Sequence, residues 1–350
     1  MSRGETGAGE TRAMEGRTQA ARAGARAAAL LAKVADLYYL RDLTQQEIAA
    51  RLGLSRPTVS RLLRRAREVG VVRIEIAAPP GTHHELERAL EDRFGLREAI
   101  VVTGDAGDPE ATRRALGRAG ARYLERALQG GARVGISWGT TLRAVVDHLR
   151  PRPLRPVVVP LVGGVGQVAP GIHANDLAAG LAAAFAGQAH LLHAPAIVAA
   201  PALARALLAD VGIRRVLAQA RTVDVAVVGI GALVPSSTLV RSGYFSAADL
   251  AQLRRRGAVG DICTRAYTAT GAPVDGALDR RILAVTLDDL RRIRTVVAVA
   301  GGAEKAAAIA GALRGGLVDV LVTDHVAAAA VLDAARTATV ASAARAEGVR

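Results

Sequence analysis

Apolar residues recur every three to four positions in three successive segments near the start of the chain, residues 30–39, 43–52 and 56–67. This spacing places the apolar side chains on one face of each segment, which is typical of amphipathic helices. Residues 71–76 alternate in part between apolar and polar, which predicts a short strand after the three helices. Three short helices followed by a strand are the order of a winged helix-turn-helix domain.

Local signals support the boundaries of the second and third helices. Thr44 with Glu47 three residues later predicts a capping box, and Gly53 supplies the tight turn after that helix. Ser55 can cap the third helix, and Pro57 is tolerated in its first turn. These signals predict a helix-turn-helix between residues 43 and 67.

The third helix has one apolar face and one basic face. At 100° per residue, its apolar side chains lie together and pack on the first two helices, whereas its five arginines are accompanied by no acidic residue. Arginines and short hydroxyl side chains suit guanine edges, phosphates and close approach in the major groove. The residues expected to contact double-stranded operator DNA are Thr44, Gln45, Ser55, Arg56, Pro57, Thr58, Ser60, Arg61, Arg64 and Arg65.

After residues 79–81, a Pro-Pro-Gly linker, the pattern changes to alternating strands and helices. Several strands are continuous apolar runs, as expected when both faces of a parallel sheet are covered. Strands are predicted at residues 99–103, 133–137, 157–161, 225–230, 295–300 and 318–322. Helices are predicted at residues 109–128, 141–149, 175–186, 247–256 and 304–313. The fold class is therefore α/β, with a helix-turn-helix domain at residues 27–78 and a large Rossmann-like domain at 79–340.

Charge and composition refine this picture. The chain has 350 residues and a net charge of +14, of which residues 1–75 carry +6, so a nucleic-acid contact is expected in that part. Residues 1–26, rich in Gly, Ala and Arg, are interpreted as a disordered basic arm. Cys263 is the single cysteine, which excludes an internal disulfide and favours a cytoplasmic location. The stretch from residue 177 to 204 lacks charged residues, but its alanines, prolines and histidines favour a buried helix followed by a buried strand over a membrane span.

Four glycine-containing loops follow predicted strands, where ligands bind in parallel α/β folds. They contain Gly139 with Thr140 and Thr141, Gly163 with Gly164, Gly229 with Gly231, and a Gly301-Gly302 turn before Lys305. Backbone amides and hydroxyls at a helix start can hold an anion. The chain has only two lysines beside 44 arginines, so a lysine after a glycine turn indicates a compact charge for a phosphate.

A dinucleotide site and a metal site are the alternatives to this anion site. The run from Gly164 to Ala169 fits G-x-G-x-x-A, but Pro170 interrupts the helix that should follow and no acidic residue lies about 20 residues further on. A dinucleotide site is therefore rejected and no cofactor is expected. Walker A, HExxH and Cys/His metal spacings are absent from the sequence, so no metal site is expected.

Taken together, these motifs resemble the SorC family of sugar-binding bacterial regulators, from about residue 30 to near the end of the chain. In the first domain the resemblance rests on residues 43–49 and 54–63. In the second it rests on residues 134–141, 224–231, 257–262 and 300–305. A departure occurs at residues 267–271, Tyr-Thr-Ala-Thr-Gly, where relatives often have an aromatic residue followed by Asp before a glycine; no specific sugar is assigned.

The resemblance implies an effector domain related to sugar-phosphate isomerases, a phosphorylated sugar as effector and a homo-oligomer, a dimer or tetramer. Carried over by motif, Gly139, Thr140, Thr141 and Lys305 would hold the phosphate. Asp261 would accept hydroxyl hydrogen bonds beside the Gly229–Gly231 loop, and Arg241 is a candidate to pair with the anion.

The sequence therefore predicts a regulator, not an enzyme, that controls a carbohydrate operon, with repression favoured over activation. Two alternatives stay open at this stage. One is a sugar-phosphate isomerase or deaminase with a DNA-binding head, which needs a general base such as Asp261 and a second acid or base group that no motif supplies. The other is a regulator of an unphosphorylated ligand.

Overall fold

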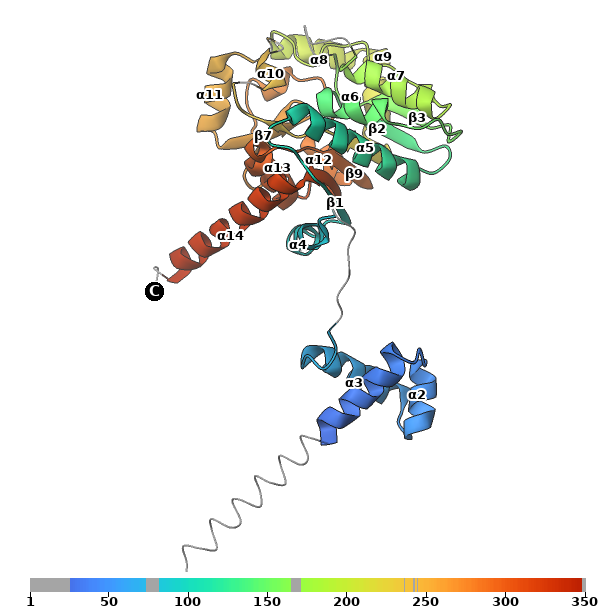
Figure 1. The fold of residues 1–350 in the computed structure, drawn as a ribbon. Coiled ribbons are helices and arrows are strands. Elements are labelled where there is room, and N and C mark those ends of the chain that lie inside the picture. The colour runs from blue at the N-terminus through green and yellow to red at the C-terminus, as the bar shows by residue number, and fades with distance from the viewer. Residues whose placement is uncertain are drawn as a thin grey trace, which may run out of the picture. The chain divides into compact units, whose positions relative to one another are not determined.

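The computed structural model describes residues 26–73, 82–164, 171–235, 237–241, 243 and 245–347. The chain forms two compact units, Met1–Ala78 and Pro79–Arg350, and each is described by itself (Figure 1). Of the predicted basic arm, residues 1–25 lie outside the described residues, and residue 26 is helical. No helix within the described residues is both long enough and apolar enough to cross a membrane.

The first unit, called the head below, is built from a helix at residues 26–39, α2 (Gln45–Leu52) and α3 (Arg56–Glu68). The predicted capping box is present, because the Glu47 amide donates to Thr44 Oγ1 and the Thr44 amide donates to Glu47 Oε2. Gly53 ends α2 at φ +62°, where a side chain would be strained. The three helices share a core of Val34, Leu37, Ile48, Ala49, Val59 and Leu63. Of the predicted wing strand, residues 71–73 are not a strand, and 74–76 lie outside the described residues.

The second unit contains a seven-stranded sheet in which every described pairing is parallel. Its strands β9 and β10 are buried along their whole length, which explains the apolar runs 296–299 and 320–322 within them. The strands follow the spatial order β1 (Glu98–Val102), β10 (Val320–Asp324), β9 (Thr295–Val299), β5 (Val225–Val228), β2 (Arg133–Ile136), β3 (Val157–Pro160) and β4 (Gln188–Ala189).

Helices cover both faces of this sheet, so the unit is a doubly wound α/β fold. One core cluster joins the sheet to α5 (Pro109–Ala127), α6 (Thr140–Asp147) and α7 (Ala174–Ala184). The opposite cluster joins it to α4 (His84–Phe94), α12 (Leu287–Arg292), α13 (Ala306–Arg314) and α14 (His325–Glu347). The other described helices are α8 (Pro201–Ala209), α9 (Val211–Ala220), α10 (Thr238–Arg241) and α11 (Ala247–Arg255), with 3-10 turns η1 (Asp279–Arg281) and η2 (Ala303–Lys305).

A second, antiparallel sheet is absent from the sequence-based expectations. It contains β6 (Gly231–Ala232), β7 (Ala258–Ile262) and β8 (Arg265–Thr268). The turn between β7 and β8 consists of Cys263 and Thr264, both in the left-handed region at φ +50° and +70°. Two-residue hairpins that need positive φ at both positions usually carry Asn-Gly or Asp-Gly, so this turn has no sequence signal that would predict it.

Several predicted elements have other bounds in the structure, and three of the differences are described here. β10 runs from residue 320 to 324, two residues later than expected. The helix expected at 304–313 begins only at Ala306, because residues 303–305 form the 3-10 turn η2. The buried strand expected after the helix at 175–186 is reduced to the two residues of β4, followed by irregular chain up to α8.

Candidate functional site

The turn from β2 into α6 presents the start of a helix to a cavity. Gly139 stands at the cap position with φ +128° and ψ 162°, a conformation that side-chain-bearing residues rarely adopt. Among the described residues no side chain caps α6, and the hydroxyl-bearing Thr140 and Thr141 occupy its first turn. Amides and hydroxyls that converge at a helix N-terminus form a site for an anion.

The loop after β5 faces this turn across the point where the strand connections reverse direction in the sheet. Gly231 pairs with Asp261 of β7, and a Cβ at position 231 would lie 2.0 Å from Asp261 Oδ1. Glycine at 231 therefore makes room for the acid. Ligands of open α/β sheets bind at such reversal points, outside the carboxyl ends of the strands.

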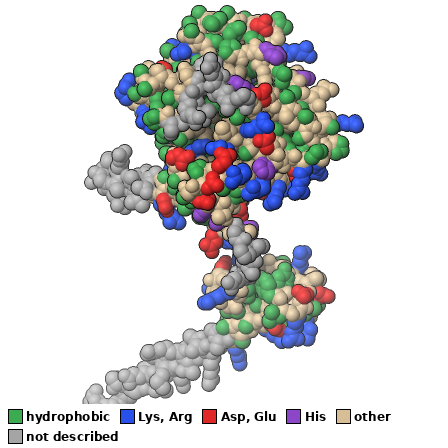
Figure 2. Space-filling model, turned by 45° about the horizontal axis from the view of Figure 1, so that its top comes forward, with side chains coloured by type: hydrophobic (Ala, Val, Ile, Leu, Met, Phe, Trp, Pro, Cys, Tyr) green, Lys and Arg blue, Asp and Glu red, His purple; other side chains and the backbone are tan. Residues whose placement is uncertain are grey.

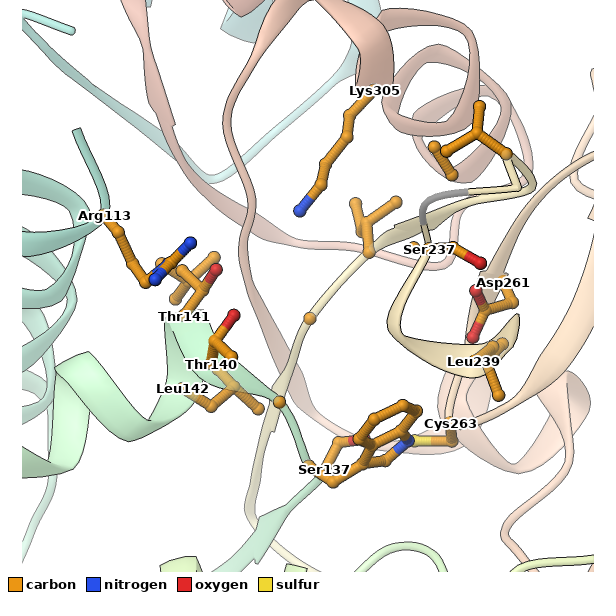
Figure 3. A pocket seen from close by; sticks show the side chains of 18 of the residues that line it. Arg113, Ser137, Thr140, Thr141, Leu142, Ser237, Leu239, Asp261, Cys263 and Lys305 are labelled. Atoms are coloured by element: carbon orange, nitrogen blue, oxygen red, sulfur yellow. The ribbon is translucent and has the colours of Figure 1, made fainter. Parts of the chain in front are cut away.

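Lys305 reaches the same cavity from the loop that follows β9. Gly302 turns the chain at φ +99°, and its amide donates to Asp324 Oδ2 at 2.6 Å. Lys305 is the last residue of η2 and the cap position of α13, so it precedes the helix instead of lying inside it. Its amine points into the cavity (Figure 3). Burial lowers the pKa of Lys305, and the carboxylates of Glu304 and Asp261 act against this lowering.

These segments enclose a cavity of about 310 Å³. Its cationic end contains Arg113, Thr140, Thr141 and Lys305, and its other end contains Ser237, Leu239, Asp261 and Cys263 (Figure 3). Seven of the ten residues that the sequence assigned to the effector line it: Gly139, Thr140, Thr141, Gly229, Gly231, Asp261 and Lys305. A second cavity of about 470 Å³ shares the lining residues Arg113, Thr140, Thr141, Glu304 and Lys305.

Of the other three assigned residues, Gly163 and Gly164 are not in the described lining of the cavity, and the placement of the Arg241 side chain is not described. A Cβ at Gly163 would lie 2.5 Å from the carbonyl oxygen of Pro195, and Gly164 exchanges backbone hydrogen bonds with Ala194 and Ala196. These glycines serve close backbone packing, which a glycine motif alone does not distinguish from ligand binding; residues 165–170, which follow them, lie outside the described residues. Arg241 ends α10, and its side chain also lies outside the described residues.

Arg113 and Cys263 are two of the cavity's lining residues that the sequence did not assign. Arg113 lies near the start of a predicted helix and has no motif around it. Cys263 lies in the unpredicted β7–β8 turn, and its thiol is hydrogen-bonded to Ser137; burial raises its pKa to about 12, so it is not a reactive thiolate.

Asp261 is 6% exposed, and this burial raises its pKa from 3.8 to about 7, against the opposing effects of the Thr264 amide and the Lys305 charge. Between about pH 4 and 7 the unfolded carboxyl is ionised while the folded one keeps its proton, so stability should fall as pH rises. We expect Asp261→Asn to remove this pH dependence, which amounts to at most about 1.4 kcal/mol of unfolding free energy per pH unit. Urea unfolding at pH 5 and pH 7 measures it, and an unchanged slope in the variant would contradict the assignment.

In the head, α3 places its basic side chains outward. Val59, Leu63 and Ala66 are buried, whereas Arg56, Pro57, Arg61, Arg64 and Arg65 are exposed and Thr58 and Ser60 are half-buried. Ser55 accepts the Thr58 amide as the helix cap, and Thr44 is likewise engaged in its capping box. Lys and Arg side chains are visible on the head in Figure 2. An exposed arginine face on the second helix of a helix-turn-helix has the geometry that recognises DNA.

Comparisons with known proteins match each of the two units to a different family. Residues 79–333 match the family described as "Putative sugar-binding domain", and residues 32–69 match sigma-70, region 4. The chain is 34% identical over 304 residues to the sorbitol operon regulator of Klebsiella pneumoniae, covering 85% of this chain and 95% of that protein. It is 35% identical over 303 residues to the deoxyribonucleoside regulator of Bacillus subtilis, covering 86% and 96%.

The crystal structure of the full-length sorbitol operon regulator SorC from Klebsiella pneumoniae is similar to this chain, with a TM-score of 0.69 and 34% identity. The match covers 87% of this chain and 98% of the SorC chain. These relatives are named as regulators and not as enzymes. The isomerase or deaminase alternative is therefore not favoured. The chain belongs to the SorC family of sugar-binding transcriptional regulators.

Proposed function

We propose that this protein binds operator DNA through α3 and that a phosphorylated sugar bound in the 310 Å³ cavity changes this binding. The observation that carries the proposal is the cavity itself. It combines Lys305, the uncapped start of α6 with Thr140 and Thr141, and a buried acid, Asp261, at its other end. A cationic end for phosphate and an acidic end for hydroxyls match the two chemical parts of a sugar phosphate.

The expected assembly is a homo-oligomer, a dimer or tetramer. Its operator should be palindromic, because heads related by two-fold symmetry require half-sites with the same symmetry. The protein acts in the cytoplasm, where its DNA is. The protein has two states that differ in affinity for the operator. The effector binds one state more tightly than the other and so shifts the balance between them. Relief of repression is the expected direction, in a carbohydrate-catabolism operon.

Binding to the DNA upstream of its own gene, titrated with a panel of sugar phosphates at fixed and stated salt, tests the proposal. Trp138 lines the cavity and is the only tryptophan, so its fluorescence reports occupancy independently of DNA. We expect one sugar phosphate to change operator affinity at least about tenfold, a coupling of about 1.4 kcal/mol. An equal response to the unphosphorylated sugar would overturn the phosphate assignment, and the absence of specific operator binding would overturn the regulator.

A further inference from the structure

Arg113 lines both the 310 Å³ cavity and the 470 Å³ cavity of the second unit. It belongs to the lining of both, together with Thr140, Thr141, Glu304 and Lys305. In Figure 3 the Arg113 side chain reaches the cavity beside Thr141, on the side where the Lys305 amine enters. Residues from three separate elements, α5, α6 and η2, thus converge at the cationic end of the cavity.

The packing of α5 on α6 explains why Arg113 lies beside Thr141. Gly117 lies one turn further along α5, and a Cβ there would lie 2.6 Å from the carbonyl oxygen of Ala144 in α6. At Gly120 a Cβ would lie 2.8 Å from Val145 Cγ2. Glycines at both positions let the two helices approach closely, and a side chain near the start of α5 then reaches the start of α6.

Arg113 and Lys305 are the cations that line both cavities, and the carboxylate of Glu304 lies in the same lining. The positive charge of Arg113 contributes to lowering the pKa of Lys305, so the two cations act on each other. Cations brought together in this way repel unless an anion is held between them. The described partner of Arg113 is Glu110, three residues earlier on α5, and the two side chains are 33% and 58% exposed. Exposed ion pairs of this spacing contribute little to stability, so the pairing is easily exchanged.

We propose that Arg113 is a further ligand of the bound anion and that Glu110 is the counter-ion which the anion replaces. The proposal rests on the proposed function, because it places the phosphate of the effector at the junction of the two cavities. The planar guanidinium offers paired donors to phosphate oxygens, which complement the single amine of Lys305 and the amides of α6. Glu110 competes for the same donors and so lowers the affinity for the anion.

The test is titration of the full-length protein with inorganic phosphate at constant ionic strength, followed by Trp138 fluorescence. Arg113→Ala is expected to weaken binding about tenfold, as loss of a charge-assisted hydrogen-bond pair implies. The phosphate affinity of Arg113→Lys should lie between those of the wild type and Arg113→Ala, because lysine keeps the charge and loses the paired donors of the guanidinium. Glu110→Gln should strengthen binding about two- to threefold, since it removes a competitor whose pairing is weak.

Arg114→Ala is the matched control, because Arg114 is the adjacent arginine of α5, is half exposed and pairs with Asp108 outside both cavities. It should bind phosphate like the wild type, and thermal melts of all variants should coincide within a few degrees. If Arg113→Ala binds like Arg114→Ala while Lys305→Ala loses binding, the Arg113 proposal is wrong and the phosphate site stands. If Lys305→Ala also binds like the wild type, or the wild type binds no phosphate, both proposals are wrong.

Discussion

Replacing Lys305 by alanine should reduce affinity for the sugar-phosphate effector about a hundredfold and leave affinity for operator DNA unchanged. Lys305 is half-buried with its amine at the cationic end of the cavity, where a charge-assisted hydrogen bond to phosphate is poorly screened by water. Removing such a group leaves the phosphate charge without its partner, which costs about 3 kcal/mol. Trp138 fluorescence measures effector binding, and operator titrations with and without effector measure the response.

The chain offers its own control for this change. Lys33 is the only other lysine and lies exposed on the first helix of the head, so Lys33→Ala removes the same chemical group from the other unit. It should leave effector affinity unchanged. Lys305→Arg keeps the charge in a larger group and should retain part of the affinity. Equal effector affinity in Lys305→Ala and Lys33→Ala would show that the phosphate does not bind at this lysine.

Replacing Arg61 by alanine should weaken specific operator binding by about 1–3 kcal/mol, or roughly five- to 150-fold, if its guanidinium reads a guanine. Arg61 is exposed on α3 opposite the buried Val59 and Leu63, and its described contact is one hydrogen bond to Thr58 Oγ1 at 3.4 Å. The folded head should therefore tolerate its loss. Affinity for the operator and for unrelated DNA, each measured over a range of salt, separates base recognition from phosphate contact.

Arg51→Ala provides the comparison, because Arg51 is an exposed arginine in the last turn of α2 and not on α3. It should lower affinity for operator and unrelated DNA by the same small factor. If Arg61 contacts only phosphate, its loss should weaken both DNAs equally and reduce the salt slope by about one. Unchanged operator affinity in Arg61→Ala would contradict the assignment of α3 as the recognition helix.

The elements of the head follow from sequence because its signals are local. The Thr44–Glu47 capping box, the left-handed Gly53 and the Ser55 cap each involve residues within four positions of one another, and the structure contains all three. The central strands of the sheet follow for a related reason, since burial on both faces demands continuous apolar runs. The β7–β8 hairpin has no such signal, because Cys263 and Thr264 adopt left-handed conformations that other residues normally supply.

The sequence by itself determined the fold class, the basic face of α3, and the glycine loops at strand ends, because helix periodicity, strand burial and turn chemistry are encoded over a few residues. Only the tertiary structure decided which loops share a cavity. It brings Thr140, Gly231, Asp261 and Lys305 together from distant parts of the chain, assigns Gly163 to backbone packing, and adds Arg113 from a helix without a motif. Such contacts depend on the order of strands and on how closely α5 packs against α6, and these are long-range properties that no local pattern encodes.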